Sequence, residues 1–271
     1  MNHAIRVEGL RKSYGSNAVL KGLSFQVTKG EIFALLGVNG AGKTTALECI
    51  EGLRRYDSGS IHVHGKLGVQ LQSASLPEAI RAMEAVRLFA KWNKARADEA
   101  TLKALGIDEI GKKQYGQMST GQKRRLHLGL ALIGDPDIVV LDEPTAGLDV
   151  EGRVALHEEI RKLRARGKTI VLASHDMAEV ESLCDRIAIL KDGGIVFAGT
   201  AEALTAKIGS RRRVRIQTAR GEECFESTNV SETLLTELAR YQEMGVAVED
   251  ISIEKGTLEE HFINIARGND A

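Results

Sequence analysis

The sequence predicts an α/β protein with a mixed β-sheet core, an inserted α-helical subdomain and a small C-terminal α+β accessory unit. A short apolar run at residues 31–36 is followed by a glycine-rich loop and then by residues 44–53, which suit a helix. Two further apolar runs, 138–141 and 169–173, flank an amphipathic segment at 154–166. This strand–helix–strand order predicts parallel strands in one sheet.

Other strands are expected on the amino-terminal side of the sheet. Residues 4–10 and 24–28 have strand character, and Gly15-Ser16-Asn17 supplies a turn between them. A second turn at Asp57-Ser58-Gly59 precedes a short strand at 60–64.

From about residue 75 to residue 134 the pattern becomes helical, with charged and apolar residues mixed. We expect this segment to form a helical subdomain inserted between two parts of the sheet. Beyond it, residues 186–190 and 195–198 flank Asp192-Gly193-Gly194, which is a hairpin signal.

The pattern changes again after Gly209, so two domains are expected, residues 1–209 and residues 210–271. The second is predicted to be a small βαβα unit. Its expected elements are a strand at 213–218, a helix at 231–244, a strand at 246–254 and a helix at 258–266.

Composition excludes several classes of protein. The 271 residues include 37 basic and 37 acidic side chains, so net charge gives no reason to expect a nucleic-acid partner. Cys49, Cys184 and Cys224 are scattered and lack CxxC spacing, which supports neither a disulfide framework nor a zinc site. The first residues lack the apolar core of a signal peptide, and the apolar runs are too short to span a bilayer.

The most informative segment is residues 37–45, which fits G-x-x-x-x-G-K-[ST] between a predicted strand and a predicted helix. Successive backbone N–H groups in such a loop form a concave anion site, and the helix start adds the positive end of its dipole. Gly40 and Gly42 let the main chain approach phosphate oxygens. Lys43 would reach the β- and γ-phosphates, and Thr44 would offer its hydroxyl to Mg²⁺. The sequence therefore predicts a nucleoside triphosphate site.

A second strand supplies carboxylates suited to the same chemistry. Residues 138–143 (IVVLDE) end in Asp142 and Glu143, which can hold Mg²⁺ and activate water. Further motifs stand in a fixed order around this strand. They are Gln72, then Met118 to Arg125 (MSTGQKRR), Pro144 to Asp149 (PTAGLD) and Ser174-His175-Asp176.

Together these motifs resemble the ATP-binding-cassette (ABC) ATPase family, a P-loop NTPase cassette, over about residues 4–209. The resemblance implies a role for each matching position. It assigns ATP binding to Tyr14, Asn39, Gly40, Ala41, Gly42, Lys43, Thr44, Thr45 and Gln72, the signature to Ser119, Gly121 and Gln122, Mg²⁺ to Thr44, Gln72 and Asp142, catalysis to Lys43, Glu143 and His175, and communication across a dimer to Asp149.

Some of these assignments have alternatives in the residues themselves. Gln70 competes with Gln72, because strand alternation puts both on the same face. Tyr14 could serve packing alone, and Glu143 could be a helix-capping acid. The signature reads MSTGQ, so Thr120 stands where glycine is usual and the backbone geometry there is in question.

The resemblance also implies that two cassettes, expected to be copies of this chain, face each other head to tail with ATP between them. Residues 67–79 and 257–262 are similar to the ABC-2, daunorubicin-resistance-like efflux group. We therefore expect the ATPase subunit of an exporter, with a separate transmembrane permease as partner. It would lie at the cytoplasmic face of the membrane and be soluble when isolated. The alternatives are an importer ATPase or a soluble non-transport ABC ATPase. A catalytically dead cassette is disfavoured by Glu143 and His175.

Overall fold

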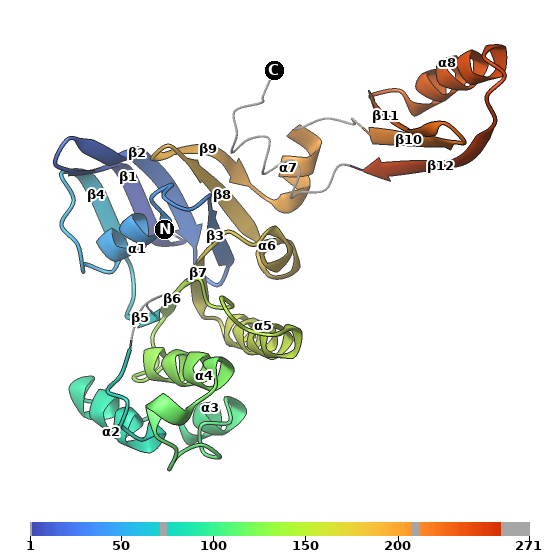
Figure 1. Cartoon of the computed structure of the whole chain (residues 1–271). Helices are drawn as coiled ribbons and strands as arrows, with labels where there is room; N and C mark the ends of the chain where they lie inside the picture. Colours follow the sequence, from blue (N-terminus) through green and yellow to red (C-terminus); the bar gives the residue numbers. More distant parts are fainter. Residues whose placement is uncertain (1, 71–74, 208–211, 256–271) are drawn as a thin grey trace. The chain divides into compact units, whose positions relative to one another are not determined.

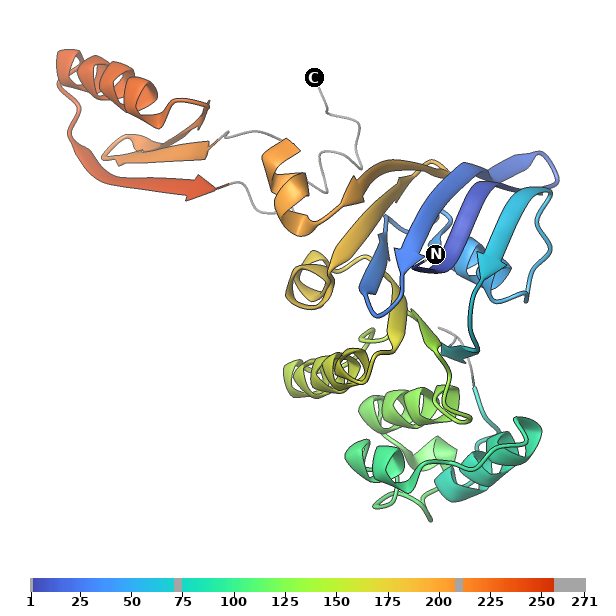
Figure 2. The ribbon, with the colours of Figure 1, turned by 180° about the vertical axis from the view of Figure 1, so that it is seen from behind.

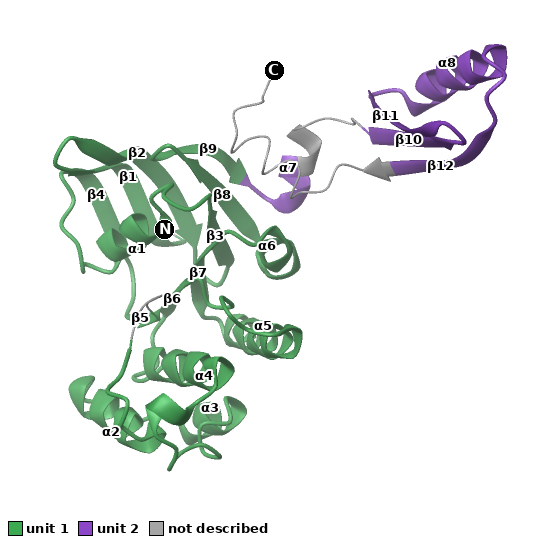
Figure 3. Ribbon diagram, in the orientation of Figure 1, with its two compact units in different colours: residues 1–198 green, residues 199–271 purple. Residues whose placement is uncertain are grey.

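A computed structural model describes residues 2–70, 75–207 and 212–255 (Figures 1 and 2). The chain divides into two compact units, residues 1–198 and residues 199–271 (Figure 3). This division falls before the expected boundary at 209/210, so helix α7 (Ala201–Lys207) groups with the second unit. Within the described part of the chain, no helix is long and apolar enough to cross a membrane.

The first unit begins with a three-stranded antiparallel sheet in the order β2-β1-β4. Strands β1 (His3–Tyr14) and β2 (Asn17–Thr28) form a long hairpin, and β4 (Ser58–Val63) pairs with the other side of β1. Gly15 turns the hairpin with a φ of 60°, a conformation that suits glycine. Both predicted strands are therefore present, and both extend closer to the predicted turn than expected.

A second sheet of six strands has the order β5-β6-β7-β3-β8-β9. Its strands are β5 (Leu67–Gln70), β6 (Ile138–Asp142), β7 (Thr169–Ser174), β3 (Ile32–Leu36), β8 (Arg186–Lys191) and β9 (Gly194–Gly199). The pairs from β5 to β8 are parallel, as the strand–helix–strand order predicted. Every residue of β3, β6 and β7 is buried, as expected for parallel strands covered on both faces. Their carboxyl ends meet at one edge of the sheet.

Helices follow the central strands and start at that edge. Helix α1 (Lys43–Ile50) follows β3, α5 (Val150–Ala165) comes after β6, and α6 (Met177–Leu183) follows β7. One continuous core contains residues of both sheets and of α1, and α1 packs against β2, β6 and β7.

The helical subdomain is inserted between β5 and β6, which are neighbours in the sheet (Figure 1). It contains α2 (Ala82–Trp92), α3 (Glu99–Ala104), the 3₁₀ turn η1 (Tyr115–Gln117) and α4 (Thr120–Ala131). The insertion therefore leaves the order of the sheet intact, and α4 packs against β5.

The second unit contains α7 and a separate antiparallel sheet in the order β11-β10-β12. Its elements are β10 (Arg212–Thr218), β11 (Gly221–Ser227), α8 (Val230–Glu243) and β12 (Val248–Lys255). Strand β11 was not predicted, so the described order is strand–strand–helix–strand. The helix expected at 258–266 lies outside the described residues.

Candidate functional site

The phosphate loop connects β3 to α1 at the edge where the parallel strands end. Gly40 and Gly42 have φ values of 84° and 106°, which residues with a Cβ rarely adopt. Gly42 is the N-cap of α1, and a Cβ there would lie 2.9 Å from Leu20 Cδ2. Asn39 and Gly40 are exposed, whereas Ala41 is buried. The loop therefore offers backbone N–H groups at its exposed tip, above a tightly packed base.

Lys43 lies inside this loop. Its side chain is nearly fully buried, and Nζ donates to the Gly37 carbonyl oxygen at 2.7 Å and lies 3.5 Å from that of Val38. Nζ is also 3.7 Å from Glu143 Oε1. Burial lowers the pKa of Lys43, and the nearby carboxylates of Glu143 and Asp142 oppose that shift. The Lys43 side chain is thus hydrogen-bonded within the loop that carries it.

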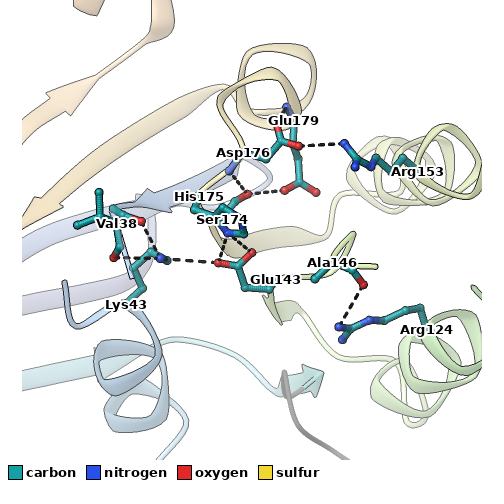
Figure 4. A network of polar contacts seen from close by, with 11 residues as sticks. Val38, Lys43, Arg124, Glu143, Ala146, Arg153, Ser174, His175, Asp176 and Glu179 are labelled. Carbon is teal, nitrogen blue, oxygen red and sulfur yellow. Dashed lines mark hydrogen bonds and ion pairs between the residues drawn. The ribbon is translucent and has the colours of Figure 1, made fainter. Parts of the chain in front are cut away.

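Glu143 connects this lysine to His175 (Figure 4). His175 Nδ1 lies 2.7 and 2.9 Å from the two carboxylate oxygens of Glu143, so Nδ1 carries the proton in this contact. Glu143 is 6% exposed, and its φ of 49° is rare for a residue with a side chain. Its carboxylate oxygens contact His175 and Lys43, and its amide donates to the carbonyl oxygen of Ala173. The structure therefore brings the three predicted catalytic residues together.

Asp142 lies beside them and suits a bound cation. Its Oδ1 is buried and has no hydrogen-bond partner among the described residues. Burial raises the pKa of Asp142, while a hydrogen bond from Thr44 lowers it. In the described part of the chain no group of three or more His, Cys, Asp or Glu side chains could hold a metal unaided. These residues fit Mg²⁺, which takes one or two protein oxygens together with substrate phosphates and water.

The signature residues lie at the start of α4, away from this cluster. Ser119 is the N-cap: its Oγ accepts from the Gln122 amide at 3.2 Å, and Gln122 Oε1 accepts from the Ser119 amide at 3.1 Å. This reciprocal pair is a capping box. Within the described residues, no hydrogen bond or ion pair joins the signature to the three catalytic residues. Thr120 is the first helical residue of α4, so no glycine-like backbone is required there.

Two other predicted residues occupy exposed positions. Tyr14 ends β1, with Lys12 Nζ 5.4 Å and the Arg54 guanidinium 5.3 Å from the centre of its ring. Asp149 is the N-cap of α5, and its Oδ1 accepts from the Gly152 amide at 2.8 Å. Asp149 therefore stabilises a helix start, in addition to any role across a dimer.

Gln72 lies outside the described residues. Its rival Gln70 ends β5 with 2% of its surface exposed, and its side-chain amide has no hydrogen-bond partner within the described part of the chain. The structure thus describes Gln70 as a buried residue and leaves the assignment of Gln72 as a proposal.

Sequence reasoning assigned no role to three residues that support the site. Lys113 Nζ donates to Oε1 of the signature residue Gln122 at 2.9 Å. Ser174 and Glu179 form a buried hydrogen bond behind His175. The sequence held one indication of the Ser174–Glu179 contact. Glu179 lies four residues, about one helical turn, after His175, so its side chain could reach back to the strand end.

The chain matches the family described as ABC transporter over residues 20–146. It is 35% identical to the linearmycin resistance ATP-binding protein of Bacillus subtilis (strain 168), over 82% of this chain and 77% of that protein. It is 32% identical to a daunorubicin resistance ATP-binding protein of Streptomyces coeruleorubidus, over 97% of this chain and 95% of that protein. A Nod factor export ATP-binding protein of Burkholderia orbicola (strain AU 1054) is 38% identical, over 74% of this chain and 72% of that protein.

Solved structures similar to this chain also come from ABC transporters. An ATP-binding subunit of an ABC transporter superposes with a TM-score of 0.68 at 27% identity, covering 76% of this chain and 93% of that one. The cbiO1 protein of Clostridium perfringens, part of an ABC transporter complex, gives a TM-score of 0.67 at 28% identity, with 76% and 92% covered. The chain belongs to the ABC transporter ATP-binding family, whose members bind and hydrolyse ATP.

Proposed function

We propose that this chain is the ATP-hydrolysing subunit of an ABC exporter, working as a pair of cassettes with a separate membrane subunit. The observation that carries the catalytic part is the cluster of Lys43, Glu143 and His175 at the ends of parallel strands. The export part is supported by relatives named for antibiotic resistance and for Nod factor export.

We infer the first step of turnover from the contacts of Glu143. Glu143 is held by Lys43 on one side and by His175 on the other (Figure 4). Phosphate oxygens compete for both hydrogen-bond donors, because a triphosphate carries more negative charge than a single carboxylate. ATP binding would then release the Glu143 carboxylate to accept a proton from the attacking water. Lys43 and His175 would stabilise charge on the transferred phosphoryl group.

Thr44 and Asp142 are the described residues that would hold Mg²⁺, with Gln72 as the proposed third. The ion would neutralise charge on the β- and γ-phosphate oxygens. The unpartnered Oδ1 of Asp142 is the feature that supports this assignment.

The position of the signature supports action in trans. Ser119 is exposed at the N-terminus of the twelve-residue helix α4, where free N–H groups and the helix dipole favour an anion. Ser119 and Gly121 would contact the γ-phosphate of an ATP bound to the partner cassette. Asp149, exposed before α5, would lie near the same interface. ATP would then hold two cassettes together, and loss of the γ-phosphate would separate them.

Reconstitution with the membrane subunit tests the direction of transport. An exporter should take substrate from the side where ATP is hydrolysed, so its ATPase activity in liposomes should rise when substrate is added on that side alone. Glu143→Gln should remove this stimulated activity. A complex that responds only to a substrate-binding protein on the opposite side would be an importer, and an ATPase indifferent to any membrane subunit would favour the soluble alternative.

A further inference from the structure

A buried hydrogen bond holds the turn that carries His175. Ser174 ends β7 fully buried, and its Oγ donates to Glu179 Oε2 at 2.6 Å. The same Oγ accepts the amide of Asp176 at 3.0 Å, and Asp176 Oδ1 accepts the amide of Glu179 at 3.1 Å. Figure 4 shows these contacts on the side of the turn next to α6. Ser174 and Asp176, which flank His175 in the sequence, are thereby hydrogen-bonded to Glu179 of α6.

Glu179 is a carboxylic acid at a buried position of α6. It is 3% exposed, and its second oxygen, Oε1, lies 3.4 Å from His157 Nε2 on α5. A carboxylate buried this deeply is costly unless it is hydrogen-bonded, and an apolar residue of similar size would fill the space at less cost. Its contacts therefore indicate a positional role, in which α5 and α6 present a fixed acceptor to Ser174.

Because His175 directly follows Ser174, the position of Ser174 at the strand end affects the position of His175. Ser174 is the last residue of β7, so holding its side chain toward α6 fixes the start of the turn from which His175 projects. The backbone of Ser174 is fixed as well, because it pairs with Leu36 in the sheet. His175 itself is exposed and makes its contact with Glu143 from this turn.

We propose that Ser174 and Glu179 are positioning residues, which set the direction in which His175 leaves β7 and so place its imidazole between Glu143 and the γ-phosphate. The proposal rests on the role proposed above for His175. Ser174 and Glu179 would act only through the His175 side chain, since the hydrogen bond between them is buried. They should therefore affect turnover and leave ATP affinity unchanged.

The test measures kcat and the KM for ATP of the full-length chain for Ser174→Ala, Glu179→Leu and Glu179→Gln. Each change is also made in a His175→Ala background. Ser182→Ala is the matched control, because Ser182 lies on α6 and its hydroxyl bonds the Glu179 carbonyl oxygen, away from the turn. We expect Ser174→Ala and Glu179→Leu to lower kcat about tenfold, with KM changed less than about twofold. Glu179→Gln keeps an acceptor for Ser174 and should retain most of the activity, as should Ser182→Ala.

The decisive result is non-additivity. In the His175→Ala background, Ser174→Ala and Glu179→Leu should cause no further fall in kcat, because residues acting through one group lose their effect when it is removed. An equal further fall would overturn the proposal, and so would loss of ATP binding together with turnover, since either would mark the pair as general support of the fold. If His175→Ala lowers kcat while neither Ser174→Ala nor Glu179→Leu does, only this inference fails. If His175→Ala itself changes nothing, the proposed function of His175 fails first.

Discussion

Glu51 ends the helix that follows the phosphate loop, and its two carboxylate oxygens are buried without a hydrogen-bond partner among the described residues. Burial raises the pKa of Glu51 to about 7 from 4.5, and the nearby Asp142 adds to the effect. The folded chain therefore keeps a proton here that the unfolded chain loses at lower pH. Stability falls as pH rises between 4.5 and about 7, and the full cost remains above that range.

Glu51→Gln should remove this pH-dependent cost. The pKa difference corresponds to about 3 kcal/mol at most, and solvent screening lowers it to about 1–2 kcal/mol. The free energy of unfolding from urea titration should therefore exceed that of the wild type by about this amount at pH 8. The advantage should be much smaller at pH 5. Glu99→Gln, at an exposed position on α3, is the control. A Glu51→Gln advantage that is the same at both pH values would contradict the assignment.

Gly121 provides a residue-scale test of action in trans. A Cβ at this position would lie 3.7 Å from Leu148 Cδ2, which is ordinary van der Waals contact, so the fold should accept a side chain. Gly121→Asp should leave ATP binding by the monomer within about twofold, yet lower turnover roughly 100-fold by placing a carboxylate against the partner's γ-phosphate. Gly121→Asn, of similar size without the charge, should be much milder. Loss of nucleotide binding by the isolated Gly121→Asp monomer would refute the trans site.

The residues of the site could be predicted from the sequence, but their contacts could not. The phosphate loop at 37–45 is readable because each position has a separate requirement for phosphate binding. The sequence does not show that Lys43 donates to the carbonyl oxygen of Gly37. It also could not show that Ser174 reaches Glu179, because that contact depends on how α6 packs against β7.

At the scale of elements, Gly68 permits the contact between β5 and α4. A Cβ there would lie 2.2 Å from the Ala131 carbonyl oxygen and 2.7 Å from Pro136 Cγ, so α4 would have to move away from the strand. Gly68→Ala should lower the free energy of unfolding by about 2–3 kcal/mol, the usual cost of overpacking. It should also lower ATPase activity, since α4 carries the signature at its first turn.

The control for that change is Gly194→Ala in β9, where a Cβ would have its nearest neighbour at 3.8 Å. Denaturant titration of both variants measures the difference. Equal stability of the Gly68→Ala and Gly194→Ala variants would show that α4 does not depend on close approach to β5.

The elements that could be predicted are those with a strong local signal. Strands β3, β6 and β7 are buried along their whole length, so their sequences are continuous apolar runs. The hairpin after β8 was readable from Asp192 and Gly193, whose φ values are 48° and 79°. Strand β11 was missed because most of its residues are exposed, and it depends on pairing with β10 instead of on an apolar pattern.

At the scale of the whole molecule, the described catalytic and signature residues all belong to the first unit. The second unit has its own small core, formed by Val214, Ile216 and Tyr241. The central proposal for the whole chain is that its first unit closes on a second copy around ATP and opens after hydrolysis.

The most direct measurement of that claim combines turnover with the state of association for Glu143→Gln. With ATP and Mg²⁺, this variant should bind nucleotide normally and hydrolyse it roughly 10²–10⁴-fold more slowly, the usual contribution of a general base. It should also elute as a stable dimer in gel filtration. Lys43→Ala should bind ATP weakly and remain a monomer. Wild-type turnover by the Glu143→Gln chain, or an ATP-saturated Glu143→Gln chain that stays monomeric, would contradict the account.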